Sequence, residues 1–508
     1  MTKILIFSAF CDISAIECAI KEVNDGNEVH VIHCDKNMRV CMHNMYGNSI
    51  FCNVCHSTMM NAWKECGVYD KLTIKDFSQL LTKEDKQKAK NFKAEFNSVN
   101  ELKTLTYKGA EVGYGAFSSY VSMTRNVMPD ITVELKTFIG FLIQKEIELF
   151  EVGEHYIQQY HPNKLIFHNG RFSTYKPFLA LAQTLHIDYI VTEHNYSKGT
   201  VVANFTKNNV VHEIEPAMKQ MRANWEKGKE YEDVEELGKQ FYERRRKGVP
   251  AGDKVYIKGQ KKGLLPEGFD STKENIVIFN SSEDEFCSIS KEFDAYLLFP
   301  NQYEALTAIF EHYKNDTTKH FYVRVHPNLK NVPFKSHLKL YELDYPNVTI
   351  IRPESPISSY DLMDASSKVI IFDSTMGIES AYWGKPVIAL TYFYYSAIDA
   401  VHTPKNTEEL WSMINNNDLE CKFNHDVIKY GYWLYRRNNP EFKYVKWHLC
   451  DFKFFGRQIV AATVGKFCGS YSIVLILEIL IRKMSKYMPF TAFHKLPCTE
   501  PYKLQNNG

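Results

Sequence analysis

The chain has 508 residues, of which 44% are hydrophobic, 14% aromatic and 24% charged, and its formal net charge is +1. This composition excludes a disordered or low-complexity chain, and the balanced charge gives no reason to expect a nucleic-acid partner. At roughly 100–200 residues per domain, the length predicts two large domains or three smaller ones.

The first residues, MTKILIFSAFCD, contain one lysine and a short apolar run, and no small-residue cleavage site follows them. Because a secretory signal needs a longer apolar region, we expect a cytoplasmic protein. In that reducing compartment the twelve cysteines of the chain should be thiols or metal ligands rather than disulfides.

The segment HCDKNMRVCMHNMYGNSIFCNVCH, at 33–56, contains four cysteines and three histidines. Its CNVCH spacing is that of covalent haem attachment, a chemistry of exported proteins. The better interpretation is a structural zinc site, which four soft ligands would close without leaving a position for catalysis. Ordinary thiols remain the default, because the spacing is not that of a standard zinc finger. The candidate ligands are Cys34, Cys41, Cys52 and Cys55.

The first elements in chain order are a strand (KILIFSA, 3–9), a helix (ISAIECAIKEVNDGN, 13–27) and a second strand (EVHVIHCD, 28–35). This order is the opening of a parallel α/β domain. Strand, helix and strand recur over 162–195, from PNKLIFHNG to DYIVTEHN. The residues between, about 70–160, are charged and predict packing helices.

A segment rich in glycine and lysine, VPAGDKVYIKGQKKGLLPEG, has little apolar periodicity and predicts a linker. The α/β order then restarts at ENIVIFNSS, and strands follow at HFYVRVHPN, NVTIIRP, KVIIFDS and PVIALTYF. We therefore predict an α/β fold of two Rossmann-like, doubly wound domains that face each other across a cleft. The expected parts are an acceptor-side domain with a helical insertion (1–245) and a linker (246–271). A nucleotide-sugar-binding domain (272–430) and a helical tail (431–508) follow.

The second domain contains the most specific combination of residues. In VRVHPN, Arg324 and His326 alternate along a strand, and His326 lies near its carboxyl edge. Further on, Ser374 and Thr375 follow a buried strand and open a helix, whose free N–H groups suit a phosphate. Glu379, one turn inside, would meet a ribose hydroxyl. For each motif alone, a capping serine or a satisfied histidine is the alternative, but together, at strand ends of one sheet, they predict an anion site.

These residues also resemble a known family. RVHPN, followed by SSYDLMDASSKVIIFDSTMGIESAYWGKPVIAL, is similar to the conserved half of bacterial capsule polysaccharide synthesis glycosyltransferases. That family includes Kdo transferases that use CMP-Kdo, and it adopts the GT-B fold; bacterial sialyltransferases share similar pieces. The match covers roughly 272–400. The resemblance implies that no metal is required for catalysis, that His326, Ser374 and Thr375 hold the donor phosphate, and that Glu379 contacts the ribose. Arg324 and Gly377, in the same motifs, are further candidate donor-binding residues.

Two further serines, Ser281 and Ser282, follow the first strand of the second domain and are candidate donor contacts. The acidic residues after them, Glu283 and Asp284, are explained by ordinary helix capping. Both interpretations of the serines stay open.

Transfer of a sugar with inversion also requires a base for the acceptor proton. Glu193, after DYIVT, is the first candidate and Asp12, after LIFSAFC, is the second. Either side chain would instead cap a helix or pair with a nearby base such as Arg171. Asn169 and Arg171, in HNGRF, are candidate contacts of the acceptor or of a phosphate, although a surface ion pair suits Arg171 equally well.

The function predicted from these residues is transfer of a sugar from a nucleotide-activated donor, CMP-linked and Kdo-like, to a surface polysaccharide or glycolipid. The alternatives are a teichoic-acid-like polyol-phosphate transferase and a non-catalytic scaffold that binds nucleotide or glycan. The expected partners are the nucleotide-sugar donor and a glycan or lipid-linked glycan acceptor.

The end of the chain, 458–488, is apolar but is interrupted by Lys466 and Glu478, so it contains no clean membrane span. Its second half, SIVLILEILIRKMSK, would either lie on the inner face of the cytoplasmic membrane or pack as a helix across the first domain.

Overall fold

The computed structural model describes the chain except residues 10–11, 198–199, 211, 252–254, 258, 296, 437–441, 446, 455–456, 465–476, 478–479 and 505–508, and it gives only the backbone of 194–197, 200–204, 447–454 and 457–464. The chain forms two compact units. The first unit consists of Met1–Val211, Ser288–Lys291 and Asn439–Thr499, and the second of His212–Cys287, Glu292–Asn438 and Glu500–Gly508.

The first unit is built on a six-stranded sheet in the order β3-β2-β1-β4-β5-β6. Its first five strands are parallel, and β6 is antiparallel to β5. Runs such as ILIF in β1 are buried throughout, as expected of a parallel sheet that is covered on both faces. The strands are β1 (Lys3–Ser8), β2 (Glu28–His33), β3 (Leu72–Asp76), β4 (Lys164–His168), β5 (Asp188–Ser197) and β6 (Thr200–Lys207).

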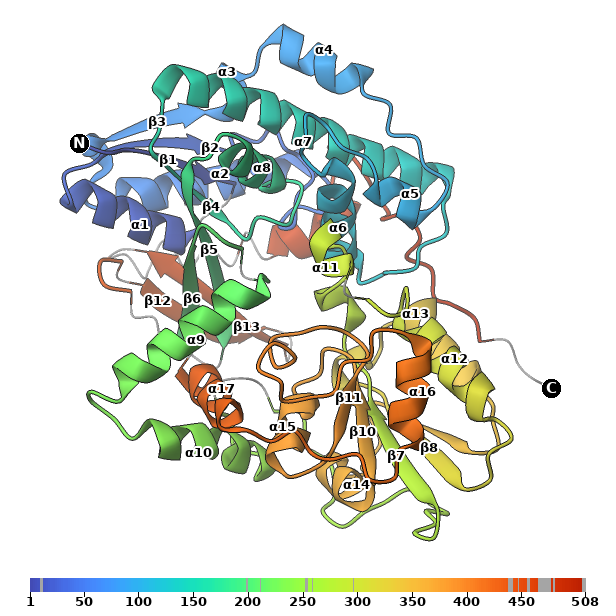
Figure 1. The fold of residues 1–508 in the computed structure, drawn as a ribbon. Coiled ribbons are helices and arrows are strands. Elements are labelled where there is room, and N and C mark those ends of the chain that lie inside the picture. Colours follow the sequence, from blue (N-terminus) through green and yellow to red (C-terminus); the bar gives the residue numbers. More distant parts are fainter. Residues whose placement is uncertain are drawn as a thin grey trace. The chain divides into compact units, whose positions relative to one another are not determined.

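Helices cover both faces of this sheet. Figure 1 shows α1 on one side of the strands and the long helix α7 on the other. The ring of His30, in β2, stacks on Tyr160 at the end of α7, with 3.7 Å between ring centroids. The helices are α1 (Ile13–Asn24), α2 (Ser49–Lys64), α3 (Phe77–Leu80), α4 (Lys83–Asn91), α5 (Val99–Lys103), α6 (Val112–Thr124), α7 (Val133–Tyr160) and α8 (Lys176–Thr184).

The second unit contains a five-stranded parallel sheet in the order β11-β10-β7-β8-β9. The chain adds strands outward on one side of β7 and then on the other, so the topological switch point lies between β7 and β10. Together the two sheets confirm the predicted α/β class with two Rossmann-like domains. The strands are β7 (Glu274–Phe279), β8 (Lys319–Arg324), β9 (Val348–Ile351), β10 (Lys368–Ile371) and β11 (Val387–Ala389).

Two hydrophobic cores lie on the faces of the second sheet. One packs α9, α10, α15 and α17 against it, and the other packs α12 and α16. The helices of this part are α9 (Ile214–Gly228), α10 (Val234–Arg246), α12 (Gln302–Tyr313), α13 (Lys335–Leu338), α14 (Ser359–Ala365), α15 (Met376–Tyr382), α16 (Thr407–Asn415) and α17 (His425–Arg436). The short helix α11 (Lys291–Asp294) begins with the last residue of a first-unit segment and continues in the second unit.

Helices α9 and α10 lie in the second unit, although the sequence suggested that they end the first domain. Their partner is α17, which packs against both. The contact of α10 with α17 is close because Gly238 faces Gly431: a Cβ atom on Gly431 would lie 2.5 Å from the Gly238 carbonyl oxygen. Glycine pairs of this kind let two helix backbones approach each other.

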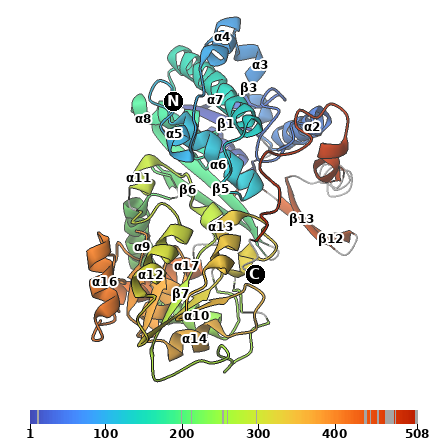
Figure 2. The ribbon, with the colours of Figure 1, turned by 90° about the vertical axis from the view of Figure 1, so that its right-hand side faces the viewer.

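The end of the chain returns to the first unit. The buried carboxylate of Glu17 accepts backbone N–H groups of Lys443, Tyr444 and Val445, at 2.7 to 3.1 Å. The antiparallel strands β12 (Trp447–Phe454) and β13 (Arg457–Val464) follow, where the sequence predicted a helical tail, and β13 lies beside β5 (Figure 2). Lys466 and Glu478 are outside the described residues. Within the described part of the chain, no helix is both long and apolar enough to cross a membrane.

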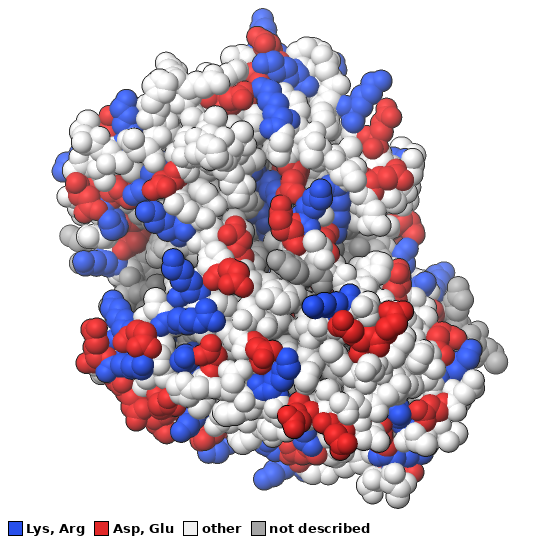
Figure 3. Space-filling view, viewed as in Figure 1, with Lys and Arg blue, Asp and Glu red and all other residues white. Residues whose placement is uncertain are grey.

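The described surface of the face in Figure 3 carries basic and acidic side chains that are intermixed. This distribution agrees with the net charge of +1.

An unusual carboxyl group, that of Glu146 in α7, is buried in the first unit. Neither of its oxygens has a hydrogen-bond partner among the described residues, and a Cβ atom on Gly115 of α6 would lie 2.3 Å from Oε1. Burial raises the pKa of Glu146 well above its usual range. The folded state therefore retains a proton that the unfolded chain releases, so stability falls as the pH rises from the unfolded pKa toward the folded one.

We expect Glu146→Gln to stabilise the protein at pH 8 by about 1–3 kcal/mol, because the amide has the same shape and needs no proton to remain neutral. The gain should shrink toward pH 4. Urea unfolding at both pH values measures it, with the exposed Glu95→Gln as control. A gain that is equal at both pH values would contradict the proposed protonation.

Candidate functional site

A hollow of about 510 Å³, open to solvent, lies in the second unit at the carboxyl ends of β7, β8 and β10. This is the switch point of the sheet, where doubly wound folds bind ligands. The structure brings five of the predicted donor-binding residues together in its lining. They are Arg324, His326, Ser374, Thr375 and Glu379.

His326 is held at the end of β8 by its backbone and its ring. Its N–H donates to Oδ1 of Asn280, at 2.7 Å, and its Nδ1 accepts the N–H of Asn328, at 3.2 Å. When the ring is neutral, this bond places the proton on Nε2. The ring of Tyr256 packs against the imidazole at 67°, with centroids 5.1 Å apart. The orientation of the imidazole is thus determined before any ligand arrives.

Arg324 brings a buried positive charge to the same hollow. Its side chain is only 3% exposed, and its two Nη atoms donate to the carbonyl oxygens of Arg352 and Ser355. Its Nε has no hydrogen-bond partner among the described residues. Burial lowers the pKa of Arg324 to about 10, so the guanidinium remains charged at neutral pH. A buried charge bonded mainly to neutral carbonyls favours the binding of an anion.

The carboxylate of Glu379, predicted to contact a ribose, forms hydrogen bonds with other side chains of the protein. Its Oε1 accepts Nε–H of Arg245, at 3.1 Å, and its Oε2 accepts the hydroxyl of Tyr360. The same guanidinium donates through Nη2 to Oγ1 of Thr375, at 3.2 Å. Glu379 is therefore the buried counter-ion of Arg245, and the predicted contact with ribose stays a prediction.

Ser374 precedes Thr375, which is the N-cap residue of α15, and its polar groups bond the first residues of the helix. Its Oγ accepts the N–H of Met376, at 3.3 Å, and its carbonyl accepts the N–H of Gly377, at 3.0 Å. These two amide groups, expected to bind phosphate, thus donate within the protein. Gly377 packs closely, since a Cβ atom there would lie 3.1 Å from Ile371 and 3.2 Å from Tyr395.

Ser281 and Ser282 are not among the residues that line the hollow. The backbone and hydroxyl of Ser281 bond the side chain of Gln302, at 3.1 and 2.9 Å, at the start of α12. The hydroxyl of Ser282 donates to Asp284, at 2.7 Å. Their described role is to hold the loop after β7 against α12, and a donor contact of either serine is untested.

The sequence did not identify Arg245, nor the wall of the hollow that is formed by Val255, Tyr256, Ile257 and Gln260. That wall belongs to the expected linker, yet it is held in place: Nε2 of Gln260 donates to Oγ of Ser359, at 3.1 Å, and Oε1 accepts the N–H of Ser359, at 2.8 Å. The sequence feature that could have indicated Arg245 is the run of three arginines, in ERRR, at the end of α10.

In the first unit, one predicted base candidate lies between β1 and α1 and the other lies within β5. Asp12 is buried: its Oδ1 accepts the N–H of Ser14 and caps α1, at 2.9 Å, and its Oδ2 accepts the hydroxyl of Thr192, at 3.0 Å. The sequence placed Glu193 at a strand end, but β5 continues to Ser197, so Glu193 lies within the strand, opposite Asn204 of β6, and is only half-buried. Its Oε1 accepts Nδ2–H of Asn169, at 3.0 Å. Asp12 thus has the capping role that was the alternative to catalysis.

Two other predictions for the first unit concern Arg171 and the cysteines. The guanidinium of Arg171 lies over the ring of Phe172, 4.8 Å from its centroid. Among the described residues, the four cysteines do not gather their sulfurs as metal ligands within 4.8 Å of one another. Burial raises the pKa of the Cys34 thiol to about 11 and that of Cys41 to about 12, so these two are protonated at neutral pH.

No protein-family model matches the chain, and no curated protein is similar to it at a significant level. Several solved structures resemble it distantly. KpsC of Thermosulfurimonas dismutans, a β-Kdo 2,4-transferase, is 13% identical, with 62% of this chain and 87% of KpsC covered and a TM-score of 0.32. The calicheamicin glycosyltransferase CalG4 is 9% identical, with 86% and 94% covered and a TM-score of 0.25. The UDP-GlcNAc 2-epimerase of Methanocaldococcus jannaschii is 13% identical, with 86% and 99% covered and a TM-score of 0.23. Such low TM-scores decide nothing about the function of this chain.

We expect Glu379→Ala to lower the free energy of unfolding by about 3–5 kcal/mol, because it leaves the buried charge of Arg245 without its partner. Removing both charges, in Arg245→Met with Glu379→Leu, should cost clearly less than the single change. Chemical denaturation of the variants measures both effects.

The neighbouring pair Arg246–Asp364 is a matched control, because its side chains are 30% and 42% exposed. Asp364→Ala should cost about 0–1 kcal/mol. If Glu379→Ala costs no more than Asp364→Ala, the buried pair does not organise the site.

Proposed function

We propose that the chain is a glycosyltransferase that takes a sugar from a nucleotide-activated donor, CMP-linked and Kdo-like, and transfers it to a surface polysaccharide or glycolipid. The observation that carries this proposal is the buried guanidinium of Arg324 beside the imidazole of His326, in a hollow at the switch point of a doubly wound sheet. The donor specificity rests on the sequence resemblance alone.

The chemistry of such a transfer matches the charges of the hollow. The acceptor oxygen bonds to the anomeric carbon while the bond from that carbon to the phosphate oxygen breaks, and the electron pair stays on the phosphate. The negative charge that develops there is stabilised by hydrogen-bond donors already in place. Arg324 and His326 are proposed for this role, with Thr375 oriented by Arg245.

The acceptor hydroxyl must lose its proton during the reaction. Glu193 is the proposed base, because it is only half-buried, whereas Asp12 is buried and caps α1. Asn169 donates to Glu193 and would orient its carboxylate. The glycan or lipid-linked acceptor, like contact with the inner face of the membrane, is part of the proposal and follows from the sequence only.

A polyol-phosphate transferase of the teichoic-acid type is the second candidate, since the same hollow suits the diphosphate of a CDP-polyol. The two reactions differ in the group that they transfer: the polyol-phosphate reaction adds a phosphodiester to the acceptor, and the sugar reaction does not. Phosphorus analysis of the elongated acceptor therefore separates them.

We expect one of CMP, CDP, UDP and GDP to raise the melting temperature, by an amount equivalent to about 2.7 kcal/mol when its concentration is 100 times its Kd. His326→Ala should weaken binding of that nucleotide at least about tenfold, or about 1.4 kcal/mol. Thermal shift identifies the nucleotide, and calorimetric titration measures the Kd.

His320→Ala is the matched control, since His320 lies at the opposite end of the same strand, where its Nε2 bonds Thr349. This variant should bind as the wild type does. If none of the four nucleotides binds, or if both variants bind equally well, the hollow is not a nucleotide-phosphate site.

A further inference from the structure

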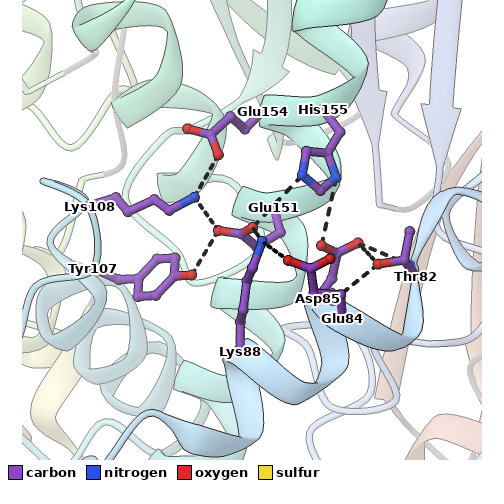
Figure 4. Close-up of polar contacts among 9 residues, drawn as sticks. All are labelled: Thr82, Glu84, Asp85, Lys88, Tyr107, Lys108, Glu151, Glu154 and His155. Carbon is purple, nitrogen blue, oxygen red and sulfur yellow. Dashed lines mark hydrogen bonds and ion pairs between the residues drawn. The ribbon is translucent and has the colours of Figure 1, made fainter.

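A cluster of charged side chains lies between α4 and α7 of the first unit (Figure 4). At its centre is the buried carboxylate of Glu151. Its Oε1 accepts the hydroxyl of Tyr107, at 2.7 Å, and Nζ–H of Lys108, at 2.6 Å, while Oε2 accepts Nζ–H of Lys88, at 2.8 Å. Burial alone would raise the pKa of Glu151, but these hydrogen bonds lower it to about 2. Glu151 is therefore ionised at any physiological pH.

The second carboxylate of the cluster, Asp85, is 0% exposed and is only half satisfied. Its Oδ2 accepts the N–H and hydroxyl of Thr82, at 3.0 and 2.7 Å, as part of the capping box of α4. Its Oδ1 has no hydrogen-bond partner among the described residues. A buried carboxylate oxygen in this condition is costly unless a ligand meets it.

His155, in α7, lies next to both carboxylates. Its Nδ1 is 3.7 Å from Oδ1 of Asp85, and its Nε2 is 4.0 Å from Oε2 of Glu151. These distances are too long for hydrogen bonds. The side chain is 45% exposed, so an ion can reach it from solvent.

The charges of the cluster do not balance. It contains four carboxylates, of Glu84, Asp85, Glu151 and Glu154, and two ammonium groups, of Lys88 and Lys108. Among these six groups, the carboxylates outnumber the ammonium groups by two. One divalent cation would cancel them.

We propose that Asp85 Oδ1, Glu151 Oε2 and an imidazole nitrogen of His155 bind a divalent transition metal ion, with zinc as the first choice. The three ligand atoms lie within 4.8 Å of one another, and ligands about 2.1 Å from a tetrahedral ion are about 3.4 Å apart, so small side-chain shifts complete the site. One imidazole with two carboxylates suits zinc better than magnesium or calcium, which prefer oxygen ligands alone.

Lys88 is the group that the ion displaces from Oε2 of Glu151. Its Nζ is already 3.1 Å from Oε1 of Glu84, one turn earlier in α4, so the ammonium group retains an anionic partner after the exchange. The bound ion joins α4 to α7 and has no part in the proposed sugar transfer.

The test is calorimetric titration of the chelator-treated full chain with zinc chloride, together with the absorption spectrum of its cobalt complex. We expect one ion per chain at this site, and a loss of affinity of at least about tenfold in His155→Ala and in Asp85→Asn. Lys88→Gln should bind zinc more tightly than the wild type, because the competing ammonium group is gone. His155 is partly exposed, so His155→Ala decides the question even if Asp85→Asn fails to fold.

Two controls separate this site from others. His186→Asn removes an exposed histidine from the same unit, at a backbone φ of +53° that asparagine tolerates, and it should bind as the wild type does. Cys52→Ser tests the cysteine segment, whose cobalt complex would show intense thiolate bands. The proposal is overturned if zinc does not bind, if His155→Ala retains wild-type affinity, or if only Cys52→Ser abolishes binding.

Discussion

The buried ion pair between Arg245 and Glu379 is the interaction on which the second unit's site depends. It joins the last turn of α10 to α15, so the segment that follows α10 has to begin beside the carboxyl ends of the strands. That segment then supplies Tyr256 and Gln260 to the wall of the hollow. A buried pair contributes little net stability, because desolvation offsets most of its attraction. The pair instead fixes the position of α10, because it determines which helix end lies beside the sheet.

The positive charge of the hollow follows from where β8 ends. Side chains alternate along a strand, so Arg324 and His326 point the same way while Val325 enters the core. β8 ends at Arg324, and Pro327 begins a short 3-10 turn in which Asn328 donates to the imidazole. The four residues RVHP thus place the guanidinium of Arg324 and the imidazole of His326 at the switch point.

This local logic explains what the sequence could and could not predict. Alternation and buried runs predicted both sheets except for β3, which lies in a range expected to be helical, and β6, which was not predicted. Strand ends predicted the location of Arg324, His326 and Ser374. The packing of α10 was not predictable in the same way, because an amphipathic helix shows that it has an apolar face but not which core receives it. The wall formed by Val255, Tyr256, Ile257 and Gln260 was not predictable either. It is attached through backbone groups and the side chain of Gln260, and such contacts produce no periodic pattern of apolar residues in the sequence.

Carboxylates of one type take different roles in this protein because their surroundings differ. Asp12 comes after β1 and Glu193 lies within β5 of the same sheet. Asp12 accepts hydrogen bonds from a helix start and a buried hydroxyl, while Glu193 stays half-buried with an amide beside it. Helix α7 shows a stronger contrast. Glu146 is buried without a partner and retains its proton, whereas Glu151, little more than one turn further along, is buried among three donors and stays ionised. The sequence shows only that each residue is acidic. The donors that keep Glu151 ionised come from α4 and from the segment before α6, which the fold brings to α7 from elsewhere in the chain.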